Sequence, residues 1–236
     1  MYMRKILRFE ELDSTNAYAK RNCSLTQDQT IIVAKTQTAG RGRLDRSWLS
    51  EPGGLYFSVV LKPTQQTHLP NLTQLMALAV CHTLQALSAP AQLKWPNDVL
   101  VGGKKICGIL SEAVTSAKGF EALVLGVGIN VAQQDLSRAG QPAVSLAMLG
   151  LHTDADAILQ QVCDAFFARY EAVLQHGFSA IRTDYLACFP YVGKEVVIAH
   201  GAAPARGTVQ TISPGGELVL NTPAGQTIIS IGDMCI

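Results

Sequence analysis

Four short apolar segments in the middle of the chain constrain its fold more than any other feature. They alternate with turns and span residues 92–95, 98–101, 105–113 and 122–129. Gly102 and Gly103 separate the second segment from the third, and a glycine pair of this kind is typical of a tight hairpin turn. These segments therefore predict a sheet in which at least part of the strands run antiparallel.

Helices are predicted to follow and precede this sheet. Apolar residues recur at spacings of three and four over 72–87, and again over 154–175, where His176 and Gly177 end the pattern. A further helix is expected to follow at once, over 178–188. The alternation of helical and extended segments favours an α+β fold, a mixed sheet with packed helices.

The amino-terminal part is predicted to add strands and one short helix. Strands are expected over 5–10, 31–34 and 55–61, which carry β-branched and aromatic residues. The cap-type residues at 13–16 precede a short helical stretch at 17–21.

The carboxy-terminal part has a different character. After Pro190, short strands are expected at 195–199, 206–212, 217–221 and 227–231, with turns that contain glycine and proline. A β-barrel of roughly 46 residues has little core of its own, so we expect it to pack against the rest of the chain. The sequence thus predicts two domains, 1–188 and 189–236.

Charge and composition exclude several classes of protein. Nineteen basic against eighteen acidic residues give a net charge of +1, without the basic surplus of a duplex-binding protein. The amino terminus has no apolar signal region, and no run approaches a membrane span, so a soluble cytoplasmic protein is expected. Six scattered cysteines are expected to be reduced core residues, and the dispersed histidines do not predict a structural transition-metal site.

The most informative polar cluster is the arginine loop, residues 38–48. It contains Arg41, Arg43 and Arg46 among flexible glycines, is closed by Trp48, and follows a predicted strand. A mobile cationic loop of this kind suits a nucleotide or an acyl-phosphate. A solvated basic turn or a nucleic-acid patch would look similar, although the loop has no interleaved aromatic residues.

Three further clusters are individually weak. Ser14, Thr15 and Asn16 read as a helix cap or as ligand-binding groups. The KWPND run at 94–98 reads as a proline turn, or as a phosphate cation beside a magnesium carboxylate. Glycines in 105–110 and 126–130 would let a ligand approach bare backbone, yet Gly126 and Gly128 lack the third glycine of a dinucleotide fingerprint, and no P-loop is present.

In order and spacing, these clusters resemble the biotin protein ligases. The resemblance rests on the residues at 14–16, the GRGR core after Gln37, KWPND, KxxGIL at 105–110 and GxGIN at 126–130. It implies a mixed sheet with packed helices, related to class II synthetases, followed by a small SH3-like barrel. It also implies an enzyme that makes biotinyl-5′-adenylate from biotin and ATP, then biotinylates a lysine of the carrier protein of acetyl-CoA carboxylase.

The resemblance also implies roles for individual residues. Biotin would be bound by Ser14, Thr15, Asn16, Gln37, Gly40, Arg41, Gly42, Arg43, Lys105 and Gly108. ATP and the adenylate would contact Arg43, Arg46, Trp48, Lys94, Asn97, Asp98 and Asn130. Catalysis would rest on Arg41, Arg43, Lys94, Asp98 and Lys105, with Asp98 as a ligand of Mg²⁺.

The sequence departs from the family pattern at two places. Asp45 stands where a glycine is common in the loop, and residues 131–143 carry no aromatic residue to close over adenosine.

No helix-turn-helix segment precedes the catalytic part, so a ligase that does not bind DNA is expected. Relatives often dimerise edge to edge, which makes a homodimer possible here.

Two alternatives remain at this point. A lipoate or octanoate ligase shares the fold class but would lack GRGR and KWPND. A biotin-sensing module without turnover would lack the phosphate cations or Asp98. Both sets of residues are present.

Overall fold

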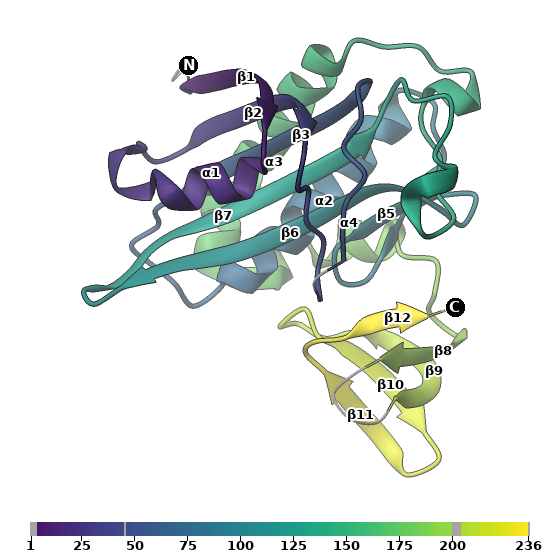
Figure 1. The fold of residues 1–236 in the computed structure, drawn as a ribbon. Helices are drawn as coiled ribbons and strands as arrows, with labels where there is room; N and C mark the ends of the chain where they lie inside the picture. The colour runs from purple at the N-terminus through teal and green to yellow at the C-terminus, as the bar shows by residue number, and fades with distance from the viewer. Residues whose placement is uncertain (1–3, 45, 200–203, 236) are drawn as a thin grey trace.

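A computed structural model describes residues 4–44, 46–199 and 204–235. Its centre is a mixed sheet of seven strands (Figure 1). In spatial order these are β1 (Ile6–Leu12), β2 (Thr30–Gln37), β3 (Gly54–Leu61), β7 (Gly119–Asn130), β6 (Lys104–Ser116), β5 (Asp98–Val101) and β4 (Ala91–Lys94). Among the strands of this sheet that the structure describes, only β1 and β2 pair in parallel, so the predicted antiparallel character is confirmed.

The hairpins of the sheet follow the predicted turns. Gly102 and Gly103 join β5 to β6 with φ values of 57° and 75°, a conformation that favours glycine. Strands β6 and β7 form the longest pair, in which Gly108 lies opposite Gly128 and Leu110 opposite Gly126. The register thus brings three glycines together at one place on the sheet.

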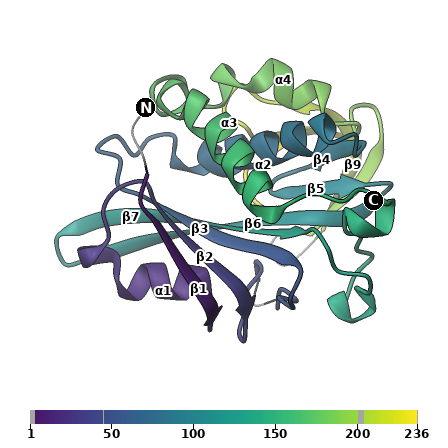
Figure 2. The ribbon, with the colours of Figure 1, turned by 90° about the horizontal axis from the view of Figure 1, so that it is seen from above.

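Helices cover both faces of the central sheet (Figure 2). The long helices α2 (Leu69–Ala86) and α3 (Ala155–His176) lie on one face, and the short helix α1 (Thr15–Arg21) lies on the other. The large core packs between the sheet and the long helices around Phe57, Leu75 and Phe166, which are fully buried. A smaller apolar cluster beneath α1 includes Ile32 and Val124.

The helix predicted over 178–188 is wrong as one continuous element. The chain instead forms a 3-10 turn at Gly177–Ala180 and a short helix α4 (Arg182–Ala187). Ile181 separates them with φ −125° and ψ −2°, outside the helical range. Its side chain is 1% exposed, so burial in the core outweighs helical continuity at this position.

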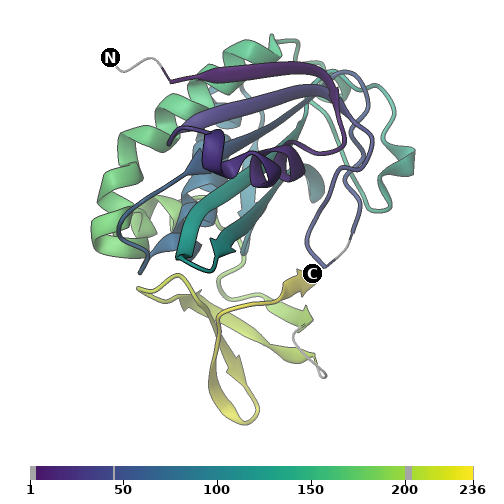
Figure 3. The same ribbon diagram turned by 60° about the vertical axis from the view of Figure 1, so that its left-hand side comes forward.

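The carboxy-terminal part forms a second, antiparallel sheet at one end of the molecule (Figure 3). Its strands, in spatial order, are β11 (Gly225–Ile229), β10 (Leu218–Thr222), β9 (Ala205–Ile212), β8 (Glu195–Ala199) and β12 (Asp233–Cys235). The last of these was not predicted. The sheet is consistent with an SH3-like domain, but no pairing within the described residues closes it into the predicted barrel.

Hydrogen bonds join this second sheet to the main part, as its small core requires. The indole Nε1 of Trp95 and the Gln74 amide both donate to the carbonyl oxygen of Gly216, at 3.0 and 2.8 Å. Arg182 on α4 donates to the carbonyl oxygen of Ile212 at 3.0 Å. The two sheets are thus docked, whereas the domain boundary after residue 188 stays a prediction.

Two other expectations concern the surface and the cysteines. No helix in the described ranges combines the length and apolarity needed to cross a membrane. All six cysteines are free and five are buried, as predicted for core residues, but Cys235 on β12 is exposed.

Candidate active site

A pocket with about 700 Å³ of empty space, part of it open to solvent, lies on the α1 side of the central sheet. Its walls come from the start of α1, the arginine loop, the turn between β4 and β5, and strands β6 and β7. A volume of this size suits a small-molecule ligand. The predicted residues that line it are Ser14, Thr15, Asn16, Gln37, Arg41, Gly42, Arg43, Arg46, Trp48, Asn97, Asp98, Lys105 and Gly108.

One end of the pocket is a polar floor made of Ser14, Thr15, Asn16 and Gln37. Ser14 caps α1, because its hydroxyl accepts a hydrogen bond from the Ala17 amide at 3.4 Å. The floor's three α1-end side chains are each 4% exposed. The cap interpretation is therefore confirmed for Ser14, and all three residues line the pocket.

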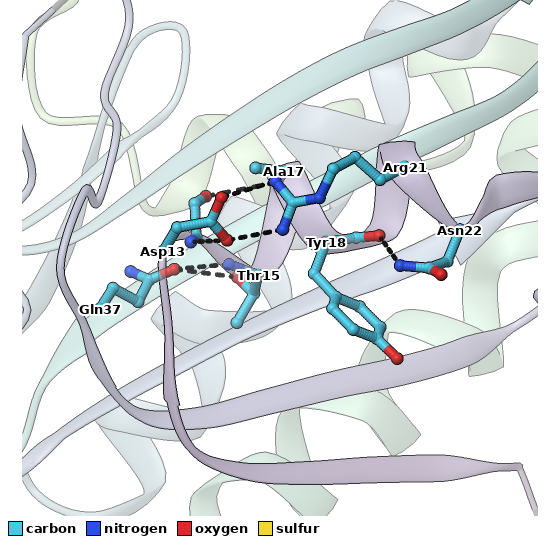
Figure 4. A network of polar contacts seen from close by, with 8 residues as sticks. Asp13, Thr15, Ala17, Tyr18, Arg21, Asn22 and Gln37 are labelled. Atoms are coloured by element: carbon cyan, nitrogen blue, oxygen red, sulfur yellow. Dashed lines mark hydrogen bonds and ion pairs between the residues drawn. The ribbon is translucent and has the colours of Figure 1, made fainter.

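Gln37 contacts Thr15 within the floor (Figure 4) and also connects the floor to the arginine loop. Its Oε1 accepts from the Thr15 backbone amide at 2.8 Å, and its Nε2 donates to Ser50 Oγ at 2.8 Å. Ser50 in turn donates to the carbonyl oxygen of Trp48 at 3.0 Å. One continuous set of hydrogen bonds thus runs from the helix end to the residue that closes the loop.

An ion pair fixes the helix that carries the floor. The guanidinium of Arg21 at the end of α1 donates to both carboxylate oxygens of Asp13 (Figure 4), at 2.5 and 2.9 Å. The hydrogen bond from Arg21 is the main cause that lowers the pKa of Asp13 from 3.8 to about 2. Sequence reasoning treated Asp13 only as a cap-type residue.

Two residues behind the floor were not predicted. Ser58 on β3 lies with its Oγ 2.7 Å from Thr15 Oγ1 and 2.6 Å from Asn16 Oδ1. Glu112 on β6 accepts from Asn16 Nδ2 at 2.8 Å and from Lys20 Nζ at 2.5 Å. Alternation along β6 places Glu112 on the same face as Gly108, which was the signal available in the sequence.

The glycines of β6 and β7 leave room for side chains that cross the pocket. A Cβ on Gly126 would come within 2.3 Å of Asn16 Oδ1, and one on Gly128 within 2.5 Å of the Trp48 indole. A Cβ on Gly108 would approach the same indole to 2.9 Å. Trp48 therefore rests on bare backbone, as the glycine pattern suggested for a ligand.

A cation and a carboxylate meet at the centre of the pocket. Lys105 Nζ lies 2.8 Å from Asp98 Oδ1, and both side chains are 15% exposed. The same ammonium lies 5.4 Å from the centre of the Trp48 ring. Asn97 in the adjoining turn donates to the Ile109 carbonyl oxygen at 2.7 Å and accepts from Arg43 at 3.0 Å.

The other end of the pocket is held by ion pairs. Arg43 and Arg46 both contact Asp233 on β12, at 3.1 and 2.6 Å. Arg43 also donates to the Gly232 carbonyl oxygen at 3.2 Å. Asp233 was missed because its partners lie about 190 positions earlier, so no local pattern links them. Asp45, singled out in the sequence, lies outside the described residues.

Three predicted site residues do not line this pocket. The carbonyl oxygen of Gly40 accepts a hydrogen bond from the Trp48 backbone amide at 2.9 Å, so Gly40 stabilises the arginine loop without lining the pocket. Lys94 pairs with Asp98 in the β4–β5 register but lines neither this pocket nor its neighbour. Asn130 lines a smaller neighbouring space of about 300 Å³, together with Trp48, Leu136 and Ala139.

The electrostatics of the pocket suit an anion. Four cationic side chains line it, from Arg41, Arg43, Arg46 and Lys105, against the two carboxylates of Asp98 and Asp233. Within the described ranges, no three His, Cys, Asp or Glu side chains gather to hold a metal ion. Mg²⁺ is commonly held by only one or two carboxylates when substrate phosphates complete its coordination shell, and a single carboxylate such as that of Asp98 fits this requirement.

Comparisons with known proteins agree with this geometry. The sequence profile of the biotin/lipoate A/B protein ligase family matches residues 8–130. A biotin–[acetyl-CoA-carboxylase] ligase of Paracoccus denitrificans is 32% identical, over 94% of this chain and 96% of its own length. A bifunctional ligase/repressor of Bacillus spizizenii is 38% identical, over 83% of this chain but only 62% of its own length.

A solved structure is similar over nearly the whole chain. The biotin protein ligase of Aquifex aeolicus, in complex with biotin and ATP, has a TM-score of 0.88 and 30% sequence identity. The alignment covers 99% of this chain and 98% of the other.

Proposed function

This chain belongs to the biotin/lipoate A/B protein ligase family, and we propose how its pocket carries out the reaction of a biotin ligase. The enzyme activates biotin with ATP to biotinyl-5′-adenylate and releases pyrophosphate. It then transfers biotin to a lysine of the carrier protein of acetyl-CoA carboxylase. The observation that carries the proposal is a pocket with a neutral polar floor at one end and arginines at the other.

Biotin lies with its ureido ring on the polar floor. The hydroxyl and amide groups there match a small, neutral, polar ring, because they can both donate and accept hydrogen bonds. The valeryl carboxylate then points towards Lys105, Arg41 and the backbone exposed at Gly108. This orientation brings the reacting carboxylate to the cationic part of the pocket.

ATP lies with its α-phosphate beside Lys105 and the loop arginines. Attack by the biotin carboxylate on the α-phosphorus forms the acyl-phosphate bond, and pyrophosphate leaves with the electrons of the broken bond. Negative charge grows on the phosphate oxygens, so fixed cations stabilise the transition state more than the ground state. No covalent enzyme intermediate is required.

The adenine ring takes the space beside Trp48 that Asn130, Leu136 and Ala139 also line. Residues 131–143 lack an aromatic residue, so the indole supplies the one aromatic face and aliphatic groups supply the other. Asn130 holds this segment rather than the base, because its amide donates to the Val144 carbonyl oxygen at 3.1 Å.

Asp98 is the residue that would hold Mg²⁺ beside the ATP phosphates. When bound, this ion would neutralise charge on the phosphates that leave. Asp98 also pairs with Lys105 at 2.8 Å and so holds that ammonium beside the biotin carboxylate and the α-phosphate. The Asp98 carboxylate is also placed to take up the proton that the acceptor lysine must lose before it attacks.

We also propose a cytoplasmic location for the protein and a strand that would join two copies of it. The six free cysteines suit the reducing cytoplasm, where ATP is also present. Strand β1 is an outer strand of the central sheet, whereas the opposite outer strand β4 is engaged by the Cys188 carbonyl oxygen, which accepts from the Leu93 amide at 2.8 Å. If the chain forms a homodimer, β1 is therefore the edge that joins it, which sedimentation of the chain with and without biotin would test.

ATP/pyrophosphate exchange tests the proposed reaction directly. The purified chain is assayed in parallel with biotin, lipoate and octanoate, and exchange should depend on biotin alone. Exchange with lipoate or octanoate would move the chain to the other branch of its family. Absence of exchange, with biotin still bound in calorimetry, would indicate a sensor without turnover.

A further inference from the structure

Glu112 lies behind the polar floor, and none of the proposed steps uses it. Its side chain is 21% exposed. Burial by itself opposes ionisation, but hydrogen bonds from Lys20 and Asn16 outweigh it and lower the pKa of Glu112. An ionised carboxylate can only accept hydrogen bonds. The Asn16 atom that faces Glu112 at 2.8 Å is therefore the amide nitrogen, which donates.

This orientation of the Asn16 carboxamide is fixed by several neighbours. The carbonyl oxygen of Leu110 also accepts from Asn16 Nδ2, at 3.3 Å. Asn16 Oδ1 must then point the other way, where Ser58 Oγ lies at 2.6 Å. The bare backbone of Gly126 makes room for Oδ1, since a Cβ there would come within 2.3 Å of it.

The orientation passes to the hydroxyl groups of the floor because each hydroxyl has one proton. Ser58 gives its proton to Asn16 Oδ1, so its own oxygen is free to accept. Thr15 Oγ1 and Ser58 Oγ lie 2.7 Å apart, a hydrogen-bonding distance. Because the single proton of Ser58 is used on Asn16, the proton between these two oxygens must come from Thr15. Thr15 Oγ1 then keeps both lone pairs, and Gln37 Oε1, which takes the Thr15 amide at 2.8 Å, keeps one.

A reversed Asn16 would reverse the chain of protons. Its Nδ2 would donate to Ser58, and Ser58 would donate to Thr15. Thr15 Oγ1 also lies 3.2 Å from Gln37 Oε1, a longer contact than the one to Ser58. In the reversed chain the Thr15 proton would go to this oxygen or into the pocket. In either case the floor would have fewer free acceptors for a ligand.

We infer that Glu112 is a positioning residue that makes the floor an acceptor of N–H groups, the hydrogen-bonding groups that a cyclic urea offers. The inference rests on the proposed function, because biotin is the ligand with such a ring. Glu112 does not touch the ligand and acts through Asn16, Ser58 and Thr15. Its partner Lys20 on α1 matters because it holds the second carboxylate oxygen.

The test uses three variants of the full chain: Glu112→Gln, Lys20→Met, and both together. The carboxamide that replaces the Glu112 carboxylate has one oxygen and one amide nitrogen. With Lys20 present, the ammonium attracts the oxygen and turns the nitrogen towards Asn16, which favours the reversed orientation. In the double variant the ammonium is gone, so the oxygen is free to accept from Asn16 Nδ2 again.

We expect Glu112→Gln to raise the Kd and KM for biotin on the order of tenfold, the effect of leaving a buried N–H group of the ligand without an acceptor. The KM for ATP and kcat should stay within about twofold, because the floor does not contact the phosphates. The double variant should regain much of the biotin affinity. Lys20→Met alone should have a smaller effect than Glu112→Gln, because the carboxylate still accepts from Asn16.

A matched control is the pair Lys35 and Glu10, which joins β2 to β1 at 2.9 Å in the same sheet and is far more exposed. Lys35→Met and Glu10→Gln should leave the biotin Kd unchanged. Thermal unfolding of every variant separates binding from stability.

Two results would overturn the inference. One is an unchanged biotin Kd for Glu112→Gln. The other is a double variant that binds biotin as weakly as Glu112→Gln does, with KM values for biotin and ATP that rise together. That result would indicate that the ion pair between Glu112 and Lys20 is purely structural. Failure of the wild-type chain to bind biotin would instead overturn the proposed function, and is seen before any variant is made.

Discussion

The two ends of the pocket are held by different kinds of interaction. The polar floor lies against the main sheet and helix α1, and the hydrogen bonds that join its side chains to one another and to Ser50 and Ser58 are between neutral groups, at 2.6–2.8 Å. At the other end, Arg46 is 59% exposed, and Arg43 and Arg46 share the Asp233 carboxylate of the second sheet.

This difference separates selection from charge stabilisation. A buried network of hydrogen bonds is rigid and penalises a ligand with the wrong donors and acceptors. Partly exposed arginines gain little from a single carboxylate and can exchange it for phosphate oxygens. The floor thus selects the ring of the ligand, whereas the loop responds to its charge.

The largest effect is expected at Lys105, where the two ends meet. Lys105→Met should lower kcat/KM in biotin-dependent ATP/pyrophosphate exchange by roughly a hundredfold or more, because one fixed cation at the reacting oxygens is lost. Lys105→Arg, which keeps the charge, should retain more activity. Similar rates for the two variants would contradict a role for this charge.

Substitution of one of two glycines on β7 should impair ligand binding at one end of the pocket and spare the other end. Gly126→Ala should raise the KM for biotin, since the added methyl meets Asn16, and Gly128→Ala should raise the KM for ATP, since it meets Trp48. Overpacking of this kind typically corresponds to roughly tenfold or more in a binding constant. Steady-state kinetics with each substrate varied will show whether the two ends separate; equal changes in both KM values would show that they do not.

Loosening the loop should release the adenylate that the pocket still forms with its remaining cations. Arg43→Gly removes contacts with Asn97, Gly232 and Asp233, so activated biotin should escape and label bystander proteins on the order of tenfold more. Arg43→Lys should lie between the wild type and this variant. Labelling of serum albumin mixed with the carrier protein measures the leak, and unchanged carrier-only labelling would contradict the prediction.

The smallest effect concerns the ion pair that supports the floor. The pKa of Asp13 is lowered to about 2 in the folded chain, below its usual 3.8. Its stabilising effect is therefore complete above the usual value and is lost as the pH falls towards the folded value. Thermal unfolding should show a small gap between the wild type and Asp13→Asn at about pH 6, which closes in acid. A gap that is independent of pH would exclude this linkage.

Sequence reasoning located most of the site because its signals are local. The cap at Ser14, the arginine loop and the KWPND turn each carry their chemistry within a few residues, and the structure brings most of them to one pocket. The hairpin glycines and the apolar periodicity likewise predicted the central sheet and the long helices. The roles of the site residues stay predictions.

The residues that were missed depend on spatial pairing instead. Ser58 and Glu112 come together with Asn16 only through the order of β3, β7 and β6 in the sheet. Strand β12 has three residues, too few for a periodic pattern, so Asp233 had no strand to belong to. Ile181 interrupts a helical pattern because of its burial, which propensity alone cannot show.

The contact between Arg43 and the Gly232 carbonyl spans 189 positions of sequence. Contacts of such long range must overcome the entropy of closing a large loop, and they form late when a chain folds. During refolding, the core around Phe57 and Leu75 should therefore become protected from hydrogen exchange before enzymatic activity returns. Activity would then report that the last long-range contact has formed, and not merely that the sheet is built.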